Sequence, residues 1–313
     1  MSTSSFSKRR GHSPFVRVVL RILANPPAAV GAVIIALVFF SAIFAPVLAP
    51  YPYDKQDLSA VEQPPSAAHW LGTDQLGRDV FSRIIWGSRS AVFVIVMVTV
   101  VNLVIGLPLG ALAGYLGGWA DTIIMRLADI LFAFPGLLFV FFIAATIKPG
   151  ILEWAKSVGL SDLARSGYLD YAVVIIALGV IGWAGLARLI RAQVMSIRER
   201  EYVIGAQAIG VSTWQIITRH VLPNAMAPII IALSMGMGDI AMSEGYLSFL
   251  GIGLQPPAPS WGNLIFENSR YWRSFPKMIW LLWIPGAVLA AVVFAFNFFG
   301  DGLNEALNPE VSD

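Results

Sequence analysis

Six long apolar runs constrain the fold of this chain more than any other feature of its sequence. They cover about residues 28–49, 90–113, 122–147, 171–190, 224–250 and 278–299. An α-helix needs ~20 apolar residues to cross the hydrocarbon core of a bilayer, and each run is long enough. Backbone N–H and C=O groups find no water inside lipid, so each run must satisfy them within itself. The sequence therefore predicts an all-α membrane protein with six transmembrane helices.

The composition agrees with a chain embedded in a lipid bilayer. Hydrophobic residues make up 57% of the 313 residues and charged residues 13%, about half the ~25% that is usual in soluble proteins. The chain has no cysteine and three histidines, which excludes disulfides and thiolate chemistry and leaves few metal ligands. A net charge of +2 without a long basic block argues against nucleic-acid binding. We expect no cofactor and no metal site in this chain.

Charges around the first run orient the chain. Five Lys and Arg residues precede this run, whereas only Lys55 lies within the 28 residues that follow it. The positive-inside rule places the N-terminus in the cytoplasm, and six crossings return the C-terminus to the same side. The run is too long for the core of a cleaved signal peptide. We therefore expect a cytoplasmic tail, 1–27, and a six-helix domain, 28–313, with no separate soluble domain.

The loop 191–223, between the fourth and fifth runs, carries the clearest local signals. Residues 201–224 are predicted to form two short helices separated by a sharp turn. Gly210 suits the left-handed cap that ends a helix, and Ser212 with Gln215 has the spacing of a capping box that begins one. Pro223 is expected to end the second helix and to move Leu222 out of helical geometry. The loop is predicted to be a compact helical structure.

Each short helix is expected to have an apolar face. On the first helix the face is formed by Tyr202, Val203, Ala206 and Ile209. On the second helix it is formed by Trp214, Ile217 and Val221. For an arbitrary loop of this length, the simplest interpretation is a helical connector that only joins two membrane helices.

This loop resembles the EAA loop of ABC importer permeases, a short helical segment that docks onto an ATPase. Leu222 and Pro223 follow Gly210 by twelve and thirteen residues, which is the spacing of that motif. Residues 204–206 are Ile-Gly-Ala where the general motif has Glu-Ala-Ala, and Glu201 lies one turn earlier. The resemblance implies ATPase contact by Glu201, Tyr202, Gly205, Ala206, Gly210, Leu222, Pro223 and Asn224.

Further segments resemble the peptide and nickel branch of these permeases, and its C-type subunit in particular. They are residues 69–92, 114–121, 247–263 and 300–309. The resemblance implies a type I ABC importer permease fold in the bacterial plasma (inner) membrane, moving di- or oligopeptides. It also implies a homologous B-type permease, two cytoplasmic ABC ATPase subunits and an extracytoplasmic solute-binding protein as partners. ATP and magnesium would bind to the ATPases, because this chain has no G-x-x-x-x-G-K-[ST] loop and is not expected to be an enzyme.

Other functions remain open at this point. The same architecture would also suit import of nickel or of oligosaccharides. A secondary transporter would normally offer more spans or an inverted repeat. Residues 236–239 contain the G-x-G-D motif of intramembrane aspartyl proteases, but that chemistry needs a second aspartate in a neighbouring span.

Charged residues within or beside the runs are the remaining candidates, because an ionisable group near the bilayer centre costs at least ~2.5 kcal/mol. Asp239 and Glu244 have no local cation. They either face a wet translocation path, where they would meet the amino terminus of a peptide, or pair with an arginine of the partner permease. Arg126 is expected to pair with Asp129. Residues 78–89 are expected to form an amphipathic helix on the outer membrane surface, which seals the bundle or docks the solute-binding protein.

Overall fold

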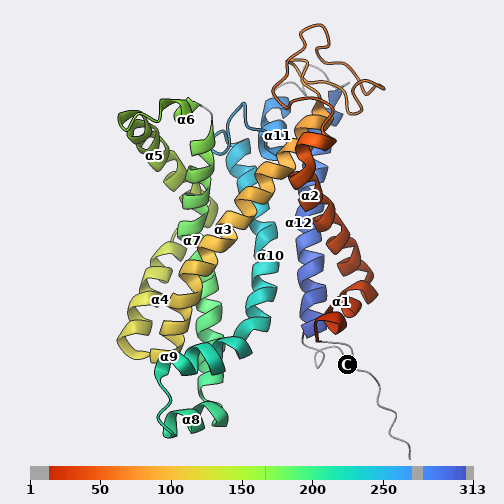
Figure 1. Cartoon of the computed structure of the whole chain (residues 1–313). Helices are drawn as coiled ribbons and strands as arrows, with labels where there is room; N and C mark the ends of the chain where they lie inside the picture. Colours follow the sequence, from red (N-terminus) through yellow and green to blue (C-terminus); the bar gives the residue numbers. More distant parts are fainter. Residues whose placement is uncertain (1–13, 166, 270–277, 308–313) are drawn as a thin grey trace, which may run out of the picture.

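The computed structural model describes residues 14–165, 167–269 and 278–307. Six of its helices are long and apolar enough to cross a membrane, which confirms the predicted fold class. They are α2 (Pro26–Leu48), α3 (Val80–Leu116), α5 (Gly136–Ser157), α7 (Tyr168–Arg198), α10 (Leu222–Phe249) and α12 (Trp280–Leu307). Figure 1 shows α2, α3, α7, α10 and α12 running between two ends of the molecule, whereas α5 lies in the half of the molecule away from α8 and α9.

The shorter helices occupy the connections. They are α1 (Pro14–Ala24), α4 (Gly118–Phe132), α6 (Ser161–Arg165), α8 (Glu201–Ala208), α9 (Thr213–Ile216), the π-helical turn η1 (Ile217–Val221) and α11 (Trp261–Ser269). In Figure 1, α8 and α9 lie at the same end as α1 and the last turns of α12. The segment 50–79, α6 and α11 lie at the opposite end. Both ends of the described chain therefore lie on the side that carries α8 and α9, as an even number of crossings requires.

Helix α1 lies within the predicted N-terminal tail, so the second half of that tail is helical. Its Arg21 guanidinium donates a hydrogen bond of 3.0 Å to the carbonyl oxygen of Ala306, in the last turn of α12. Ile22 is buried against Leu303 and Ala306. A count of long apolar runs passes over such a helix because its eleven residues are too short to span a bilayer.

The third apolar run is broken, which corrects the span predicted at 122–147. Helix α4 ends at Phe132, Pro135 precedes the first turn of the next helix, and α5 begins at Gly136. A proline has no N–H to donate and disfavours helical geometry in the residue before it, so the hydrophobic run contains two helices. The third membrane-spanning helix is α5, and α4 leads into it.

Helix α4 is held to α7 by two ion pairs. Arg188 lies 2.5 Å from Asp129, and Arg191 binds Asp121 through two hydrogen bonds. The predicted pairing of Asp129 with Arg126 is wrong. The partner of Asp129 comes instead from α7, which lies beside α4 in space although it is far away in the sequence.

The crossing of α3 and α7 forms the centre of the bundle. Gly106, Gly110 and Gly114 recur every fourth residue on the face of α3 that meets α7. A Cβ atom added to them would lie 3.0, 2.6 and 2.7 Å, respectively, from a backbone carbonyl oxygen of α7. Such close backbone approach is how small residues pack membrane helices together, where the hydrophobic effect gives little drive.

The stretch 78–89 does not form a separate helix on the membrane surface, as the sequence had suggested. It leads into α3 and forms its first turns, and most of its side chains are buried. The Asp79 carboxylate accepts a hydrogen bond of 2.7 Å from the N–H of Ser82 and lies 2.9 Å from Nδ1 of His69. Asp79 therefore caps α3 instead of pairing with Arg83.

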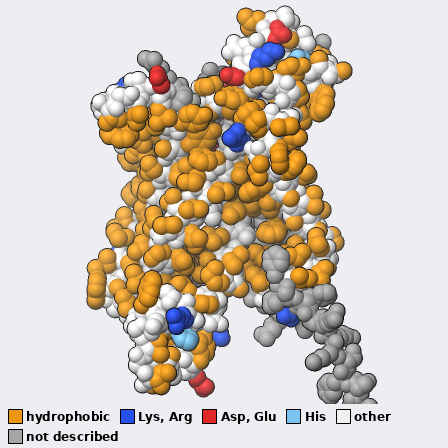
Figure 2. Space-filling model, in the orientation of Figure 1, with side chains coloured by type: hydrophobic (Ala, Val, Ile, Leu, Met, Phe, Trp, Pro, Cys, Tyr) orange, Lys and Arg blue, Asp and Glu red, His pale blue; other side chains and the backbone are white. Residues whose placement is uncertain are grey.

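Figure 2 shows hydrophobic side chains covering the middle of one face of the molecule, with most charged side chains towards its two ends. Many large apolar residues there are exposed, among them Val47, Val104 and Phe142. Their exposure agrees with lipid as the solvent of this surface.

Candidate functional site

The segment formed by α8, the following turn and α9 protrudes at one end of the bundle, as Figure 1 shows. Gly210 has a φ of 80°, so the left-handed turn predicted after the first short helix is confirmed. The Ser212 hydroxyl accepts a hydrogen bond of 3.4 Å from the N–H of Gln215, which confirms Ser212 as the cap of α9. We call residues 201–216 the protruding segment.

The protruding segment is anchored to the ends of α3 and α7. Val203 and Ala206 are buried in a cluster with Tyr115 of α3 and with apolar side chains of α7. Gln207 donates a hydrogen bond of 3.1 Å to the Tyr115 hydroxyl. The Arg198 guanidinium donates a hydrogen bond of 2.8 Å to the Tyr115 carbonyl oxygen, near the end of α3. The segment therefore has a fixed position on the bundle.

Its other side is apolar and exposed. The side chain of Ile209 is 81% exposed and that of Trp214 is 71% exposed, and Tyr202 and Ile204 are exposed beside them. Tyr202 and Ile209 had been predicted to share one apolar face with Val203 and Ala206, but the structure exposes the first two and buries the other two. Helix α8 ends at Ala208, so Ile209 lies beyond the helix and does not follow its face. These four exposed apolar side chains of the protruding segment are here called the exposed patch.

The structure corrects the end of the second short helix. Pro223 does not end it, because Leu222 has helical angles (φ −59°, ψ −43°) and begins α10. The π-helical turn η1 joins α9 to α10, and Pro223 lies in the first turn of α10, where a missing N–H costs little. The Asn224 side chain donates a hydrogen bond of 2.6 Å to the carbonyl oxygen of His220. The connecting loop is therefore shorter than the predicted 191–223, since α7 also extends to Arg198.

The residues assigned from the EAA resemblance fall into two groups. Glu201, Tyr202, Gly205 and Gly210 are exposed on the protruding segment, whereas Ala206 is buried. Leu222, Pro223 and Asn224 lie in the first turn of α10, where Leu222 is half-buried and the other two are exposed. A Cβ atom added to Gly205 would meet no atom within 4 Å in this chain. Nothing within the chain therefore requires a glycine at that position.

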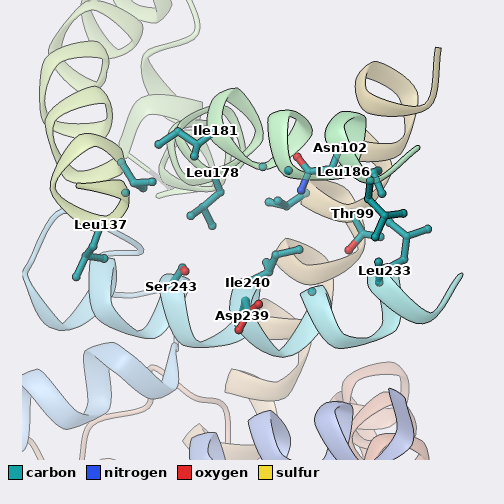
Figure 3. Close-up of a pocket in the computed structure, with 18 of the residues that line it drawn as sticks. Thr99, Asn102, Leu137, Leu178, Ile181, Leu186, Leu233, Asp239, Ile240 and Ser243 are labelled. Atoms are coloured by element: carbon teal, nitrogen blue, oxygen red, sulfur yellow. The ribbon is translucent and has the colours of Figure 1, made fainter. Parts of the chain in front are cut away.

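A cavity of about 540 Å³ lies between α3, α5, α7 and α10. Apolar side chains form most of its wall. The polar side chains are Thr99 and Asn102 from α3 and Asp239, Ser243 and Tyr246 from α10. Figure 3 shows Asp239, Ile240 and Ser243 on α10, with Asn102, Leu178 and Ile181 on the other side of the cavity. Thr99 and Asn102 could not be predicted as lining residues, because isolated polar residues in an apolar run are common.

The structure separates Asp239 from Glu244, which the sequence analysis had grouped together. Asp239 is exposed and lines the cavity. Glu244 is 1% exposed and does not line this cavity, and its carboxylate accepts hydrogen bonds of 2.7 Å from Ser248 and 2.8 Å from Ser260. The Glu244 carboxylate ties the end of α10 to the residue that precedes α11. Of these two carboxylates, Asp239 lines the cavity and Glu244 does not.

At the end opposite the protruding segment, four charged side chains form a compact ion cluster. Arg78 and Arg83 both bind the carboxylates of Asp74 and Glu267, at N to O distances of 2.6 to 2.8 Å. Asp74 lies in the segment after α2, and Glu267 lies in α11. The cluster therefore fastens that segment to α11 across the start of α3.

A second cavity, of about 700 Å³, lies at the same end and is lined by aromatic side chains. The rings of Tyr53 and Trp86 meet edge to face at 5.1 Å, and the Tyr171 hydroxyl lies 2.6 Å from the Ser90 hydroxyl. Burial raises the pKa of the Tyr53 phenol. Arg89 also lines this cavity, over the ring of Trp86.

Comparison with known proteins agrees with this architecture. The family described as "Binding-protein-dependent transport system inner membrane component" matches residues 106–313. A second family, "N-terminal TM domain of oligopeptide transport permease C", matches residues 13–65.

Several similar proteins align over nearly the whole chain. The oligopeptide transport system permease protein OppC of Bacillus subtilis (strain 168) is 35% identical, over 94% of this chain and 88% of its own length. The dipeptide transport system permease protein DppC of the same organism is 36% identical, over 93% and 84%. The glutathione transport system permease protein GsiD of Pectobacterium atrosepticum is 35% identical, over 93% and 89%. The chain therefore belongs to the family of binding-protein-dependent transport system inner membrane components, the permease subunits of ABC importers.

Proposed function

We propose that this chain is the C-type permease subunit of an ATP-driven importer that moves di- or oligopeptides across the bacterial plasma (inner) membrane. It would act with a homologous B-type permease, two cytoplasmic ABC ATPase subunits that bind ATP and magnesium, and an extracytoplasmic solute-binding protein. The chain itself would carry no catalytic residue and no cofactor. Its N- and C-termini would lie in the cytoplasm, on the same side as the protruding segment.

The exposed patch supports the proposal that the protruding segment couples ATP hydrolysis by the partner subunits to movement of the helix bundle. Tyr202, Ile204, Ile209 and Trp214 expose large apolar surfaces at an end of the molecule, outside the apolar belt that faces lipid. Exposed apolar clusters of this kind mark protein contact surfaces. The opposite face of the same segment is packed onto α3 and α7. A partner that moves this segment therefore moves the bundle.

We propose that the cavity between α3, α5, α7 and α10 is part of the path taken by the solute. Helix α10 supports this assignment because it lines the cavity and continues through η1 into the protruding segment. Asp239 is a polar group of this path, whereas Glu244 would enter the path only if the contact between α10 and the residue before α11 opens.

One experiment tests the coupling surface. We expect Ile209→Asp, in the importer reconstituted with its partner subunits, to lower co-purification of the ATPases and peptide uptake by at least tenfold. Large apolar residues at the centre of an interface typically contribute 2 kcal/mol or more, or roughly thirtyfold in affinity. The matched control is Leu58→Asp, because Leu58 is 74% exposed and lies at the opposite end. It should leave ATPase co-purification unchanged. Full ATPase binding and uptake by Ile209→Asp would refute the coupling assignment.

The cargo is tested with the same reconstituted importer. Radiolabelled dialanine, trialanine and pentaalanine are compared with Ni²⁺ and with maltotriose, each delivered with the solute-binding protein. We expect ATP-dependent uptake of at least one alanine peptide and of neither other solute. Uptake of Ni²⁺ or maltotriose alone would replace the peptide assignment by one of the alternative cargoes. Solute movement without any ATPase subunit would indicate a secondary transporter.

The orientation is tested by labelling, which the absence of cysteine in the sequence makes simple. Single cysteines are introduced as Gln56→Cys and Ala208→Cys, since both positions are exposed and lie at opposite ends. A membrane-impermeant maleimide should label Gln56→Cys in spheroplasts and Ala208→Cys only after the membrane is permeabilised. The reverse pattern would overturn the proposed topology.

A further inference from the structure

The charged side chains that line the cavity are of one sign among the described residues. Its lining contains one carboxylate, Asp239, and no lysine, arginine or histidine. No hydrogen bond or ion pair joins the Asp239 side chain to another residue in the part of the chain that the structure describes. The remaining wall is mostly apolar, so water and counterions screen this carboxylate less than they would at an open surface. The cavity therefore favours a positively charged group.

Two buried acceptors lie in the same wall. The Oγ1 atom of Thr99 and the Oδ1 atom of Asn102 are both inaccessible, and neither has a hydrogen-bond partner among the described residues. Buried polar atoms nearly always have a hydrogen-bond partner, and the described residues of this chain provide none for these two atoms. Both residues come from α3 and line the cavity together with Asp239 of α10. Because neither oxygen is accessible, the charged acceptor that an ammonium group in the cavity would meet is the Asp239 carboxylate.

We propose that this cavity binds the protonated α-amino group of the peptide in transit, with Asp239 as its counter-ion. This inference rests on the proposed peptide importer and adds the chemical group that the path recognises. The carboxylate end of a peptide would instead meet the Asp239 carboxylate in this cavity, and two negative charges in contact repel each other. Glu244 does not share the role, since hydroxyl groups of Ser248 and Ser260 already bind its carboxylate.

The test uses the reconstituted importer with its binding protein. The probes are the alanine peptide that is imported fastest and its desamino analogue, in which a propionyl group replaces the first alanine. Both are supplied at concentrations that saturate the binding protein, so uptake reports steps in the membrane subunits. The variants are Asp239→Asn, which keeps the shape and removes the charge, and Asp239→Glu, which keeps the charge. The matched control is Asp162→Asn, because Asp162 is exposed in α6 and does not line the cavity.

Loss of one charge-assisted contact typically lowers affinity about tenfold. We expect Asp239→Asn to reduce maximal uptake of the free-amine peptide about tenfold, with Asp239→Glu restoring it to within threefold of wild type. The desamino analogue should cross at similar rates in wild type and Asp239→Asn, or too slowly to measure in both. Asp162→Asn should match wild type with either probe.

Three results would overturn the inference. The first is normal uptake of the free-amine peptide by Asp239→Asn. The second is an equal proportional loss with both probes, which would give Asp239 a role unrelated to the amine. The third is loss of the partner permease from purified Asp239→Asn, which would make Asp239 an inter-subunit ion-pair residue. Absence of any peptide uptake by the wild-type importer would instead refute the proposed function itself.

Discussion

The ion cluster of Arg78, Arg83, Asp74 and Glu267 yields a prediction whose size follows from its geometry. Arg83 is 1% exposed, and its Nη1 atom lies 2.6 Å from Asp74 and 2.7 Å from Glu267. Removing one partner of a buried ion pair costs about 3–5 kcal/mol, because the other charge stays buried without compensation. Arg78 remains bound to both carboxylates after Arg83 is removed. The expected loss from Arg83→Met is therefore at the lower limit, about 3 kcal/mol.

Thermal unfolding of the purified chain in detergent measures this loss. At roughly 2–4 °C per kcal/mol, Arg83→Met should lower the melting temperature by roughly 6–12 °C. Arg89→Met is the matched control, since Arg89 also lies in α3 but is exposed, and among the described residues it has a cation–π contact with Trp86, 5.6 Å from the ring centroid. Such a cation–π contact contributes about 0.5–1 kcal/mol, so the control should melt no more than roughly 4 °C below wild type.

A double-mutant cycle separates the cluster from general packing effects. Asp74→Asn combined with Arg83→Met should cost less than the sum of the two single changes, because each single change already breaks the same contact. Two results would refute the view that this cluster fastens the segment after α2 to α11. One is an equal melting temperature for Arg83→Met and Arg89→Met. The other is a double variant whose loss of stability equals the sum of the two single losses.

The remaining predictions concern backbone geometry and a surface contact. Gly110→Ala should destabilise the purified chain by about 1–3 kcal/mol in thermal unfolding, since the added Cβ would lie 2.6 Å from a carbonyl oxygen of α7. Gly236→Ala is the matched control and should be neutral or stabilising, because its added Cβ would meet no atom of the described residues within 4 Å. Gly210→Ala should cost about 1–2 kcal/mol at a φ of 80° and should increase protease cleavage within the protruding segment relative to wild type. Glu305→Gln removes the charge from an exposed hydrogen bond of 2.6 Å to Asn25 and should change the melting temperature by no more than roughly 4 °C, because exposed charges contribute about 0–1 kcal/mol.

Signals that depend on local sequence were sufficient for much of this fold. The six spanning helices follow from the length of apolar runs, and the turn at Gly210 and the cap at Ser212 follow from residue types that those positions need. The break before α5 was missed because the residues on both sides of Pro135 are apolar, so hydropathy stays high through it. Pro223 was misinterpreted because a proline suits both the residue after a helix and the first turn of the next one.

Contacts between elements distant in the sequence were beyond local reasoning. Asp129 was assigned to Arg126, the cation three residues away, whereas the structure pairs it with Arg188, 59 residues along the chain. Glu244 carried the same signal as Asp239 in the sequence, an acid without a local cation. Only the fold shows that serine hydroxyl groups satisfy one of them and that the other lines a cavity.

The continuous path of α9, η1 and α10 has a mechanical consequence. Residues Thr213–Phe249 form a continuous helical stretch of 37 residues, in which α9 turns away from the axis of α10 (Figure 1). The backbone N–H is missing at Pro223 and Pro228, and no non-helical linker separates the two ends of the stretch. A displacement of α9 would therefore pass to α10 through a helical bend and not through a loop. Asp239 belongs to α10, so under the proposed coupling such a displacement would also move the carboxylate that lines the cavity.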